Sequence, residues 1–219
     1  EVEYHDHSSP TIHVAFPVVA APGEGSAAGD LLAGEVSIVI WTTTPWTIPG
    51  NRAIAAAADQ TYVRLRVTGV EEGSRVAVGR EIIVAEALAE SVARDCRISA
   101  YETAGRIPGE ALVGTRCAHP LRGRGYEFDV PVPAPVFVTM DQGSGFVHIA
   151  PGHGADDFEL GVANGIEVPD TVGEDGSYYP HVPLFAGKRV LTDTGKEGDA
   201  NGAVMAALEE AAALLSRAR

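Results

Sequence analysis

The sequence lacks the features that mark several classes of protein. Its longest apolar run, Val36 to Trp41, is interrupted by Ser37 and falls far short of the roughly 20 residues that span a bilayer. It has only two cysteines, Cys96 and Cys117, and no CxxC pair, which argues against a zinc knuckle and favours a reducing compartment. Residues 1–7 have neither the basic start nor the apolar stretch of a signal peptide. These absences predict a cytoplasmic protein with no membrane partner.

Basic residues are also scarce. The chain has 16 Lys and Arg against 30 Asp and Glu, a net charge of −14, whereas a protein that binds nucleic acid alone needs a positive surface. Any nucleic acid must therefore be held mainly by something else. With 219 residues, 45% of them hydrophobic, the chain is long and apolar enough to bury a core. Since it lacks an initiator methionine, we expect a single domain, residues 1–219, excised from a larger protein.

Strand signals outnumber helix signals. β-rich runs cover residues 11–19, 36–41, 62–67, 75–78, 98–103, 135–139 and 146–149. Helical patterns cover residues 84–95, about 155–164 and 203–218. Short strands with few helices predict a mainly β domain with peripheral helices, whose sheet closes wholly or partly into a barrel. Residues 165–187, rich in Gly, Pro, Asp and Tyr, are either an ordered loop near a binding site or a series of turns.

The first cluster that indicates chemistry is residues 41–51, Trp-Thr-Thr-Thr-Pro-Trp-Thr-Ile-Pro-Gly-Asn, which follows a strand run. Proline fixes φ, so the chain leaves the strand as a rigid turn that presents the threonine hydroxyls in defined positions. A hydroxyl both donates and accepts, which suits a small neutral or zwitterionic substrate and a positioned water. The alternative is that these hydroxyls only bond their own backbone.

The second cluster is residues 143–158. It predicts a glycine turn, a short strand with His148, a Pro-Gly-His-Gly corner and a helix that begins near Asp156 and Asp157. One aspartate can cap the helix while its neighbour, about 100° around the axis, faces a pocket and pairs with an ammonium. A metal site of His148, His153 and Asp157, a triad that uses Ser144, and a buried structural histidine are the alternatives, although neither of the first two has an established spacing.

Together the two clusters resemble the editing domain of isoleucyl-tRNA synthetase, a class I aminoacyl-tRNA synthetase. The motifs are Trp-Thr-Thr-Thr-Pro-Trp-Thr and Gly-x-Gly-x-Val-His-x-Ala-Pro-Gly-His-Gly-x-Asp-Asp-Phe, in the same order. The flanking segments Val2-Glu3-Tyr4, Ser9-Pro10 and Phe137-Val138-Thr139 add to the match, which weakens after about Gly195. His148 and the corner Gly152-His153-Gly154 favour the isoleucyl branch over its valyl and leucyl relatives.

The resemblance implies a distorted β-barrel of the valyl/leucyl/isoleucyl editing-domain type, inserted in a catalytic domain that this sequence lacks. The implied function is hydrolytic proofreading of valyl-tRNA(Ile), with valyl-adenylate as a further candidate substrate, within an isoleucine-tRNA ligase of protein biosynthesis. Editing itself would need no metal or cofactor, because ATP and Mg belong to the synthetic domain. The implied partners are the 3′ end of isoleucine tRNA, the valine moiety and the rest of the synthetase.

The resemblance also implies roles for particular residues. Thr42, Thr43, Thr44 and Thr47 would surround the amino acid and the terminal adenosine. Trp46 would shape the pocket, Asn51 would contact the substrate, and His148 would crowd it or hydrogen-bond to it. Asp157 would hold the α-ammonium, and Thr44, His148 and Asp157 would be the catalytic group. Water would attack without a covalent intermediate, assisted by threonine hydroxyls, His148 and the tRNA's own ribose hydroxyl.

Three further hypotheses stay open. The tRNA end could approach past a basic patch of Arg116, His119, Arg122 and Arg124, whose alternative is an ordinary solvated loop. The chain could instead be a non-catalytic β-barrel module that binds a small amino acid or nucleotide. It could also be a free-standing hydrolase.

Overall fold

The framework of the molecule is a branched sheet of ten strands, seen in a computed structural model that describes residues 9–23, 27–133 and 138–218. The strands are β1 (Thr11–Ala20), β2 (Val36–Thr42), β3 (Ala53–Ala56), β4 (Thr61–Val70), β5 (Glu81–Ala85), β6 (Ile98–Pro108), β7 (Arg116–Ala118), β8 (Asp129–Pro131), β9 (Phe146–Ile149) and β10 (Leu214–Ala218). The helices are α1 (Ala27–Leu31), α2 (Ala89–Asp95), α3 (Ala155–Ala163) and α4 (Ala200–Glu210), with 3₁₀ turns η1 (Pro45–Gly50), η2 (Glu86–Leu88) and η3 (Gly109–Leu112).

The sheet runs in the order β6-β4-β5-β2-β1-β7-β8, and β10, β9 and β3 branch from it. Strand β1 pairs with β2 along one edge and with both β10 and β7 along the other. Strand β2 lies parallel to β5 at its start and parallel to β9 at its end. The sheet therefore divides at the end of β2.

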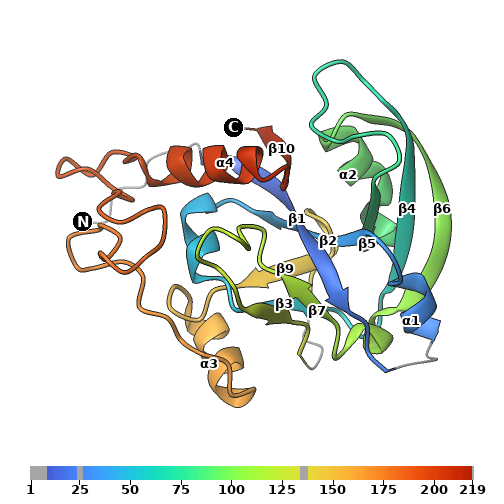
Figure 1. Ribbon diagram of the computed structural model, residues 1–219, viewed down its shortest axis with the longest axis horizontal. Helices are drawn as coiled ribbons and strands as arrows, with labels where there is room; N and C mark the ends of the chain where they lie inside the picture. Colours follow the sequence, from blue (N-terminus) through green and yellow to red (C-terminus); the bar gives the residue numbers. More distant parts are fainter. Residues whose placement is uncertain (1–8, 24–26, 134–137, 219) are drawn as a thin grey trace.

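Strand β2 lies at the centre because its residues are apolar on both faces. Its sequence Val-Ser-Ile-Val-Ile-Trp-Thr is buried almost throughout, as is typical of a strand covered on both sides. One large cluster of buried side chains draws on strands from β1 to β10, and the helices lie around the periphery of the sheet (Figure 1). The expected mainly β fold with peripheral helices is confirmed.

The expected closure into a barrel is incomplete. Within the described residues no strand pairing joins β6 to β8, the two ends of the seven-strand path, so the sheet stays open. Strand β8 has three residues and ends at Pro131, which has no N–H to extend a hydrogen-bonded ladder.

Three sequence-based elements differ from the structure. Residues 75–78 form turns between Gly73 and Gly79, both at positive φ, and not a strand. The predicted helix 84–95 is a helix only from Glu86, because the preceding residues belong to β5 and pair with β2 and β4. The predicted helix 203–218 ends at Glu210, and its second half is β10.

Several other predictions can be placed. The helix expected near 155–164 is α3, and the strand expected at 146–149 is β9. Most of the expected strand 135–139, and the flanking motif residues Val2-Glu3-Tyr4 and Phe137, lie outside the described residues. Both cysteines are free and buried, and burial raises the pKa of the Cys96 thiol to about 12. No helix in the described ranges has the length and apolar character to cross a membrane.

Candidate functional site

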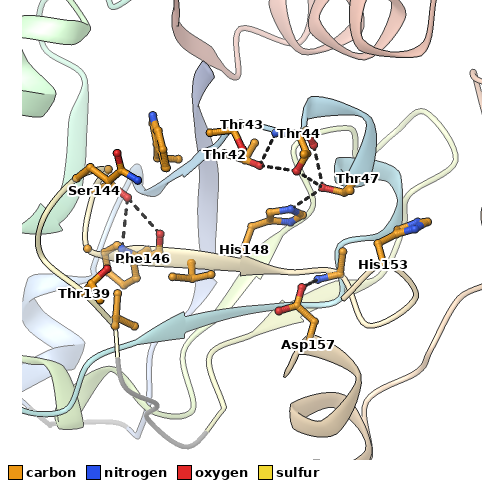
Figure 2. Close-up of a pocket in the computed structure, with 17 residues that line it drawn as sticks. Thr42, Thr43, Thr44, Thr47, Thr139, Ser144, Phe146, His148, His153 and Asp157 are labelled. Atoms are coloured by element: carbon orange, nitrogen blue, oxygen red, sulfur yellow. Dashed lines mark hydrogen bonds between the residues drawn. The ribbon is translucent and has the colours of Figure 1, made fainter. Parts of the chain in front are cut away.

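A cavity of about 310 Å³ opens where β2 and β9 end. Figure 2 shows His148 between the threonine turn that follows β2 and the first turn of α3, which carries Asp157. The cavity is lined by Trp41, Thr42, Thr43, Thr44, Thr47, Val138, Thr139, Gln142, Gly143, Ser144, Gly145, Phe146, Val147, His148, Ala150, His153 and Asp157. Its volume is at the small end of the range for ligand sites in proteins.

The register of the two parallel strands brings the two sequence clusters together. Trp41 of β2 pairs with Val147 of β9, so Thr42 and His148 follow at equivalent positions. Successive side chains in a strand alternate between its faces. Thr42 and His148 therefore lie on the same face of the sheet, opposite to the face of Trp41 and Val147. Both are buried. Since the strands are parallel, the turn after β2 and the corner after β9 leave the sheet at the same edge.

The two glycines of Gly-Ser-Gly let the chain approach β2 and β5 closely. Gly143 and Gly145 have φ values of +87° and +83°, a region that disfavours side chains. A Cβ at Gly145 would lie 2.2 Å from the Cβ of Ala85, and one at Gly143 would lie 3.3 Å from the Trp41 side chain. Ser144 bonds with the backbone of Phe146, and among the described residues it has no hydrogen bond to a histidine that would support a triad.

The threonine hydroxyls form a connected network (Figure 2). The Oγ1 atoms of Thr42 and Thr44 lie 3.2 Å apart, and those of Thr44 and Thr47 lie 3.4 Å apart. The backbone N–H of Thr44 donates to Thr42 Oγ1, and the Thr47 hydroxyl donates to the carbonyl oxygen of Thr44. Thr44 is the exposed member, so its hydroxyl is the most accessible to a ligand and to water.

Both ring nitrogens of His148 have hydrogen-bond partners. Nε2 lies 2.8 Å from Thr47 Oγ1, and Nδ1 lies 3.1 Å from Nδ2 of Asn51. Burial, together with a smaller contribution from His153 nearby, lowers the pKa of His148 to about 4, so the ring is neutral at neutral pH.

Asp157 lies in the first turn of α3 and faces the cavity. Its Oδ2 accepts a hydrogen bond from the backbone N–H of Ala150 at 2.8 Å, which ties the helix to the end of β9. Burial raises the pKa of Asp157, the Ala150 bond opposes that shift, and Asp156 adds to it. Asp156 is exposed and does not line the cavity. A carboxylate that lines the cavity and is oriented through one of its oxygens is suited to an ammonium group.

Residues from the later part of the chain brace the cavity wall. His153 Nε2 lies 2.5 Å from Thr171 Oγ1, and the His153 ring meets the Trp46 ring edge-on at 4.8 Å. The backbone N–H of Trp46 donates to Oδ1 of Asn201, and the Tyr178 hydroxyl donates to the Trp46 carbonyl. Residues 165–187 therefore include an ordered loop that packs against the site. The composition of residues 165–187 had left this loop open as a neighbour of a binding site, whereas no sequence signal pointed to Asn201.

The structure brings most of the predicted residues to one cavity, with two exceptions. Thr42, Thr43, Thr44, Thr47, His148 and Asp157 line it. Trp46, expected to shape the pocket, and Asn51, expected to contact the substrate, are not among the lining residues. Trp46 packs behind His153, and Asn51 is fully buried behind His148. The sequence positions of Trp46 and Asn51 indicate that they lie near the cavity, but not whether their side chains line it or pack behind the residues that do.

The expected basic patch is not a free surface. His119 is buried, stacks on Tyr126 and bonds the Ile48 carbonyl, so it supports η1 from inside. Arg116 and Arg122 both pair with Asp129, and Arg124 pairs with Glu210. These carboxylates offset the positive charge that would attract phosphates.

Within the described ranges no three His, Cys, Asp or Glu side chains gather closely enough to hold a metal ion. His148, the central member of the metal alternative, has both nitrogens engaged by Thr47 and Asn51.

Comparison with known proteins gives isoleucine–tRNA ligases among the relatives of the chain. The chain is 47% identical over its whole length to the isoleucine–tRNA ligase of Caulobacter vibrioides and 50% identical over 87% of its length to that of Gluconobacter oxydans. It spans only 23% and 19% of these two ligases. No protein-family model matches the chain.

Solved structures support the fold independently. The editing domain of the P. falciparum cytosolic leucyl-tRNA synthetase in space group P1 aligns over 93% of this chain and 96% of its own, with a TM-score of 0.55 at 11% identity. A form of that domain with deletions of two insertions gives a TM-score of 0.57. At this identity the likeness concerns the fold alone.

Proposed function

The chain belongs to the isoleucyl-tRNA synthetase family, as a homologue of a segment that makes up about a fifth of those ligases, and from this premise we propose that it hydrolyses valine wrongly attached to isoleucine tRNA. Valyl-adenylate is a second candidate substrate. The 3′ end of the tRNA, the valine moiety and the remainder of a ligase are the proposed partners, in the cytoplasm.

One observation carries the proposal: Asp157 and the threonine network lie on the same cavity. The free aminoacyl end of a mischarged tRNA has an ammonium, an ester carbonyl and a short branched side chain. A charge-assisted bond between carboxylate and ammonium is worth about 1.5–3 kcal/mol, enough to select a free amino group. The hydroxyls supply donors and acceptors for the ester and for a water.

The small difference in size between valine and isoleucine explains why a synthetase would need an editing site in addition to its synthetic site. Valine and isoleucine differ by one methylene, which a binding pocket discriminates by only about 1–3 kcal/mol, a limit for which the isoleucyl enzyme is itself the standard example. A small hydrolytic cavity that admits valine and excludes isoleucine by steric clash adds a second selection. His148 and Thr47 lie in its wall and are buried, so their positions are fixed.

The reaction needs little from the protein because an aminoacyl ester is already activated. The oxygen of water forms a bond to the carbonyl carbon, the ester C–O bond breaks, and the departing ribose oxygen takes the proton. Positioning of the two reactants supplies several kcal/mol. Thr44, whose hydroxyl is exposed to the cavity, and Thr42 beside it are the groups suited to orient the water.

The test is a deacylation assay with valyl-tRNA(Ile) and isoleucyl-tRNA(Ile). It uses the chain itself and the C. vibrioides ligase in which this chain replaces the matching segment. We expect release of valine well above the spontaneous rate and little release of isoleucine, with the unaltered ligase as the control. A chain that binds valyl-tRNA but releases amino acid only at the spontaneous rate is a binding module, and this outcome contradicts the proposal.

A further inference from the structure

We propose that Asn51 is a positioning residue that holds His148 as the neutral ring with its proton on Nε2, so that His148 acts as a hydrogen-bond donor to Thr47 and not as a base. The inference deepens the proposed function of this cavity and rests on it for its catalytic consequence. Its structural part concerns the chain alone and can be tested without tRNA.

The first step is the direction of the Thr47 bonds. The Thr47 hydroxyl has one proton, and a carbonyl oxygen can only accept, so the 2.9 Å bond to the Thr44 carbonyl uses that proton. Thr47 Oγ1 lies 2.8 Å from Nε2 of His148 and has only lone pairs left to offer to it. The proton between them must therefore belong to Nε2.

The second step is the orientation of the Asn51 amide. Its Nδ2 donates to the Ala53 carbonyl at 3.0 Å, and the second proton of Nδ2 is available to Nδ1 of His148 at 3.1 Å. The opposite orientation of the amide would set its oxygen against the Ala53 carbonyl oxygen, so the contact with Ala53 selects the observed one. Asn51 Oδ1 is buried without a hydrogen-bond partner among the described residues, so the amide is held by its donor side.

The third step is the charge of the ring. An imidazolium donates from both nitrogens, and its Nδ1–H would face the Asn51 N–H. The titratable side chains nearby are His153, from the corner after β9, His119, between β7 and β8, and Asp157, on the same cavity. Burial of His148, with a further contribution from His153, lowers its pKa to about 4.

The consequence is a chain of hydrogen bonds with one direction. It runs from Asn51 to His148, from His148 to Thr47 and from Thr47 to the Thr44 carbonyl. No nitrogen of His148 is left to take a proton from water. This series of hydrogen bonds instead fixes the Thr44–Thr47 turn, and with it the Thr44 hydroxyl that faces the cavity.

The experiment is NMR of the 219-residue chain with ¹⁵N-labelled histidine, at pH 7 and without tRNA. The nitrogen shifts distinguish the two neutral tautomers and the imidazolium, and His148→Gln assigns the resonance. We expect a protonated Nε2 and an unprotonated Nδ1. A proton on Nδ1, or a charged ring, overturns the proposal without any variant.

Two variants separate the role of Asn51 from that of Thr47. Asn51→Asp replaces the donor with an acceptor and should move the proton to Nδ1 or charge the ring, whereas Thr47→Val should leave the tautomer unchanged. If Asn51→Asp does not fold, the double variant Asn51→Ala/Thr47→Val, which removes the partners of both ring nitrogens, should populate both tautomers, whereas Thr47→Val alone should not. An Asn51→Asp variant that folds and has the wild-type His148 spectrum, or a double variant that keeps the single tautomer, overturns the proposal. Asn164→Asp, an exposed change of the same kind at the end of α3, is the matched control.

The catalytic consequence has its own readout. In the chimeric ligase Asn51→Asp should lower kcat for valyl-tRNA deacylation by about 10²-fold, the loss expected from a misplaced reacting group, with KM little changed. Unchanged kcat contradicts the positioning role. If the wild-type chain shows no deacylation, the proposed function fails while the spectra still decide the tautomer.

Discussion

At the scale of single residues, the two adjacent carboxylates of α3 differ in their surroundings. Asp157 lines the cavity and accepts from Ala150, whereas Asp156 is exposed. Asp157→Asn keeps an oxygen for the Ala150 N–H but loses the charge. We expect kcat/KM for valyl-tRNA deacylation to fall about 10–100-fold, the equivalent of one charge-assisted bond. Asp156→Asn is the matched control and should keep near wild-type activity; equal losses in both variants would refute the assignment of Asp157.

The same residue predicts the pH dependence of editing. Deacylation needs a charged Asp157, and burial raises the pKa of that group, so activity should fall on the acid side at a higher pH than an exposed aspartate would give. His148, with a pKa of about 4, stays neutral near neutral pH, so it should cause no change in kcat/KM in that pH range. The substrate ammonium, with a pKa of about 8, should give an alkaline decline. A kcat/KM profile with a limb centred on the ordinary histidine pKa would instead indicate a histidine base.

How far the site could be predicted depends on whether the residue lies in a local pattern. The hydroxyl cluster and the acidic helix start follow from sequence, because turn chemistry and the preference for acidic residues in a first helical turn are local. The expected capping by an aspartate is wrong, since the N-cap of α3 is Gly154 and no side chain caps it. Asn51 was expected at the substrate and lies behind His148, a distinction set by the pairing of β9 with β2 and β3. Thr171 lies in residues 165–187, whose composition left open an ordered loop near a binding site, but its contact with His153, like that of Asn201 with Trp46, depends on long-range packing that no local pattern specifies.

At the scale of elements, the C-terminal segment shows tertiary pairing overriding local propensity. Its Ala and Leu content predicted one helix over 203–218, but the helix ends at Glu210 and Leu214–Ala218 adds to the edge of β1. The helix propensity of alanine and leucine is worth little free energy per residue. Pairing with the unpaired N–H and C=O groups along the edge of β1 outweighs it. Strands β2 and β4 were predictable since they are rich in apolar and β-branched residues, whereas β5 between them was not predicted as a strand and β3, with its Ala-Ile-Ala-Ala sequence, gave no strand signal.

The turn between α4 and β10 carries a testable strain. Ala212 has a φ of 52°, a left-handed conformation that costs a residue with a Cβ roughly 1–2 kcal/mol. Ala212→Gly should therefore raise the free energy of unfolding by about 1 kcal/mol and Tm by about 2–4 °C, measured by thermal and urea unfolding. Ala211→Gly, one residue earlier at an ordinary φ of −80°, is the control and should destabilise the protein. A loss of stability in Ala212→Gly would contradict this account of the turn.

At the scale of the whole molecule, three histidines in the described part of the chain are buried in neutral form. Burial lowers the pKa of His13 and His148 to about 4 and that of His119 to about 3. Groups whose pKa is lowered by folding stabilise the native state above their unfolded pKa, and this stability is lost as the pH falls. As the pH falls from about 6.5 toward 5, these three side chains come to bind nearly three more protons in the unfolded chain than in the folded one, so their contribution to stability should decrease with a slope that approaches about 4 kcal/mol per pH unit.

This acid sensitivity can be measured from urea unfolding midpoints between pH 7 and pH 5. The midpoint should be steady above pH 7 and fall steeply below pH 6. His181→Gln, at an exposed histidine, should leave the slope unchanged. A midpoint that does not move between pH 7 and pH 5 would mean that these side chains are not held neutral by the fold.

The central claim is that one cavity holds the mischarged amino acid, with Asp157 on its ammonium and the threonine network around its ester. The most direct measurement is a crystal structure of the chain with a non-hydrolysable valyl-adenosine analogue. The account predicts the analogue's α-amino nitrogen within hydrogen-bond distance of the Asp157 carboxylate, with the ester mimic beside Thr44. An analogue bound elsewhere, or bound in the cavity with its amino group turned away from Asp157, would contradict it.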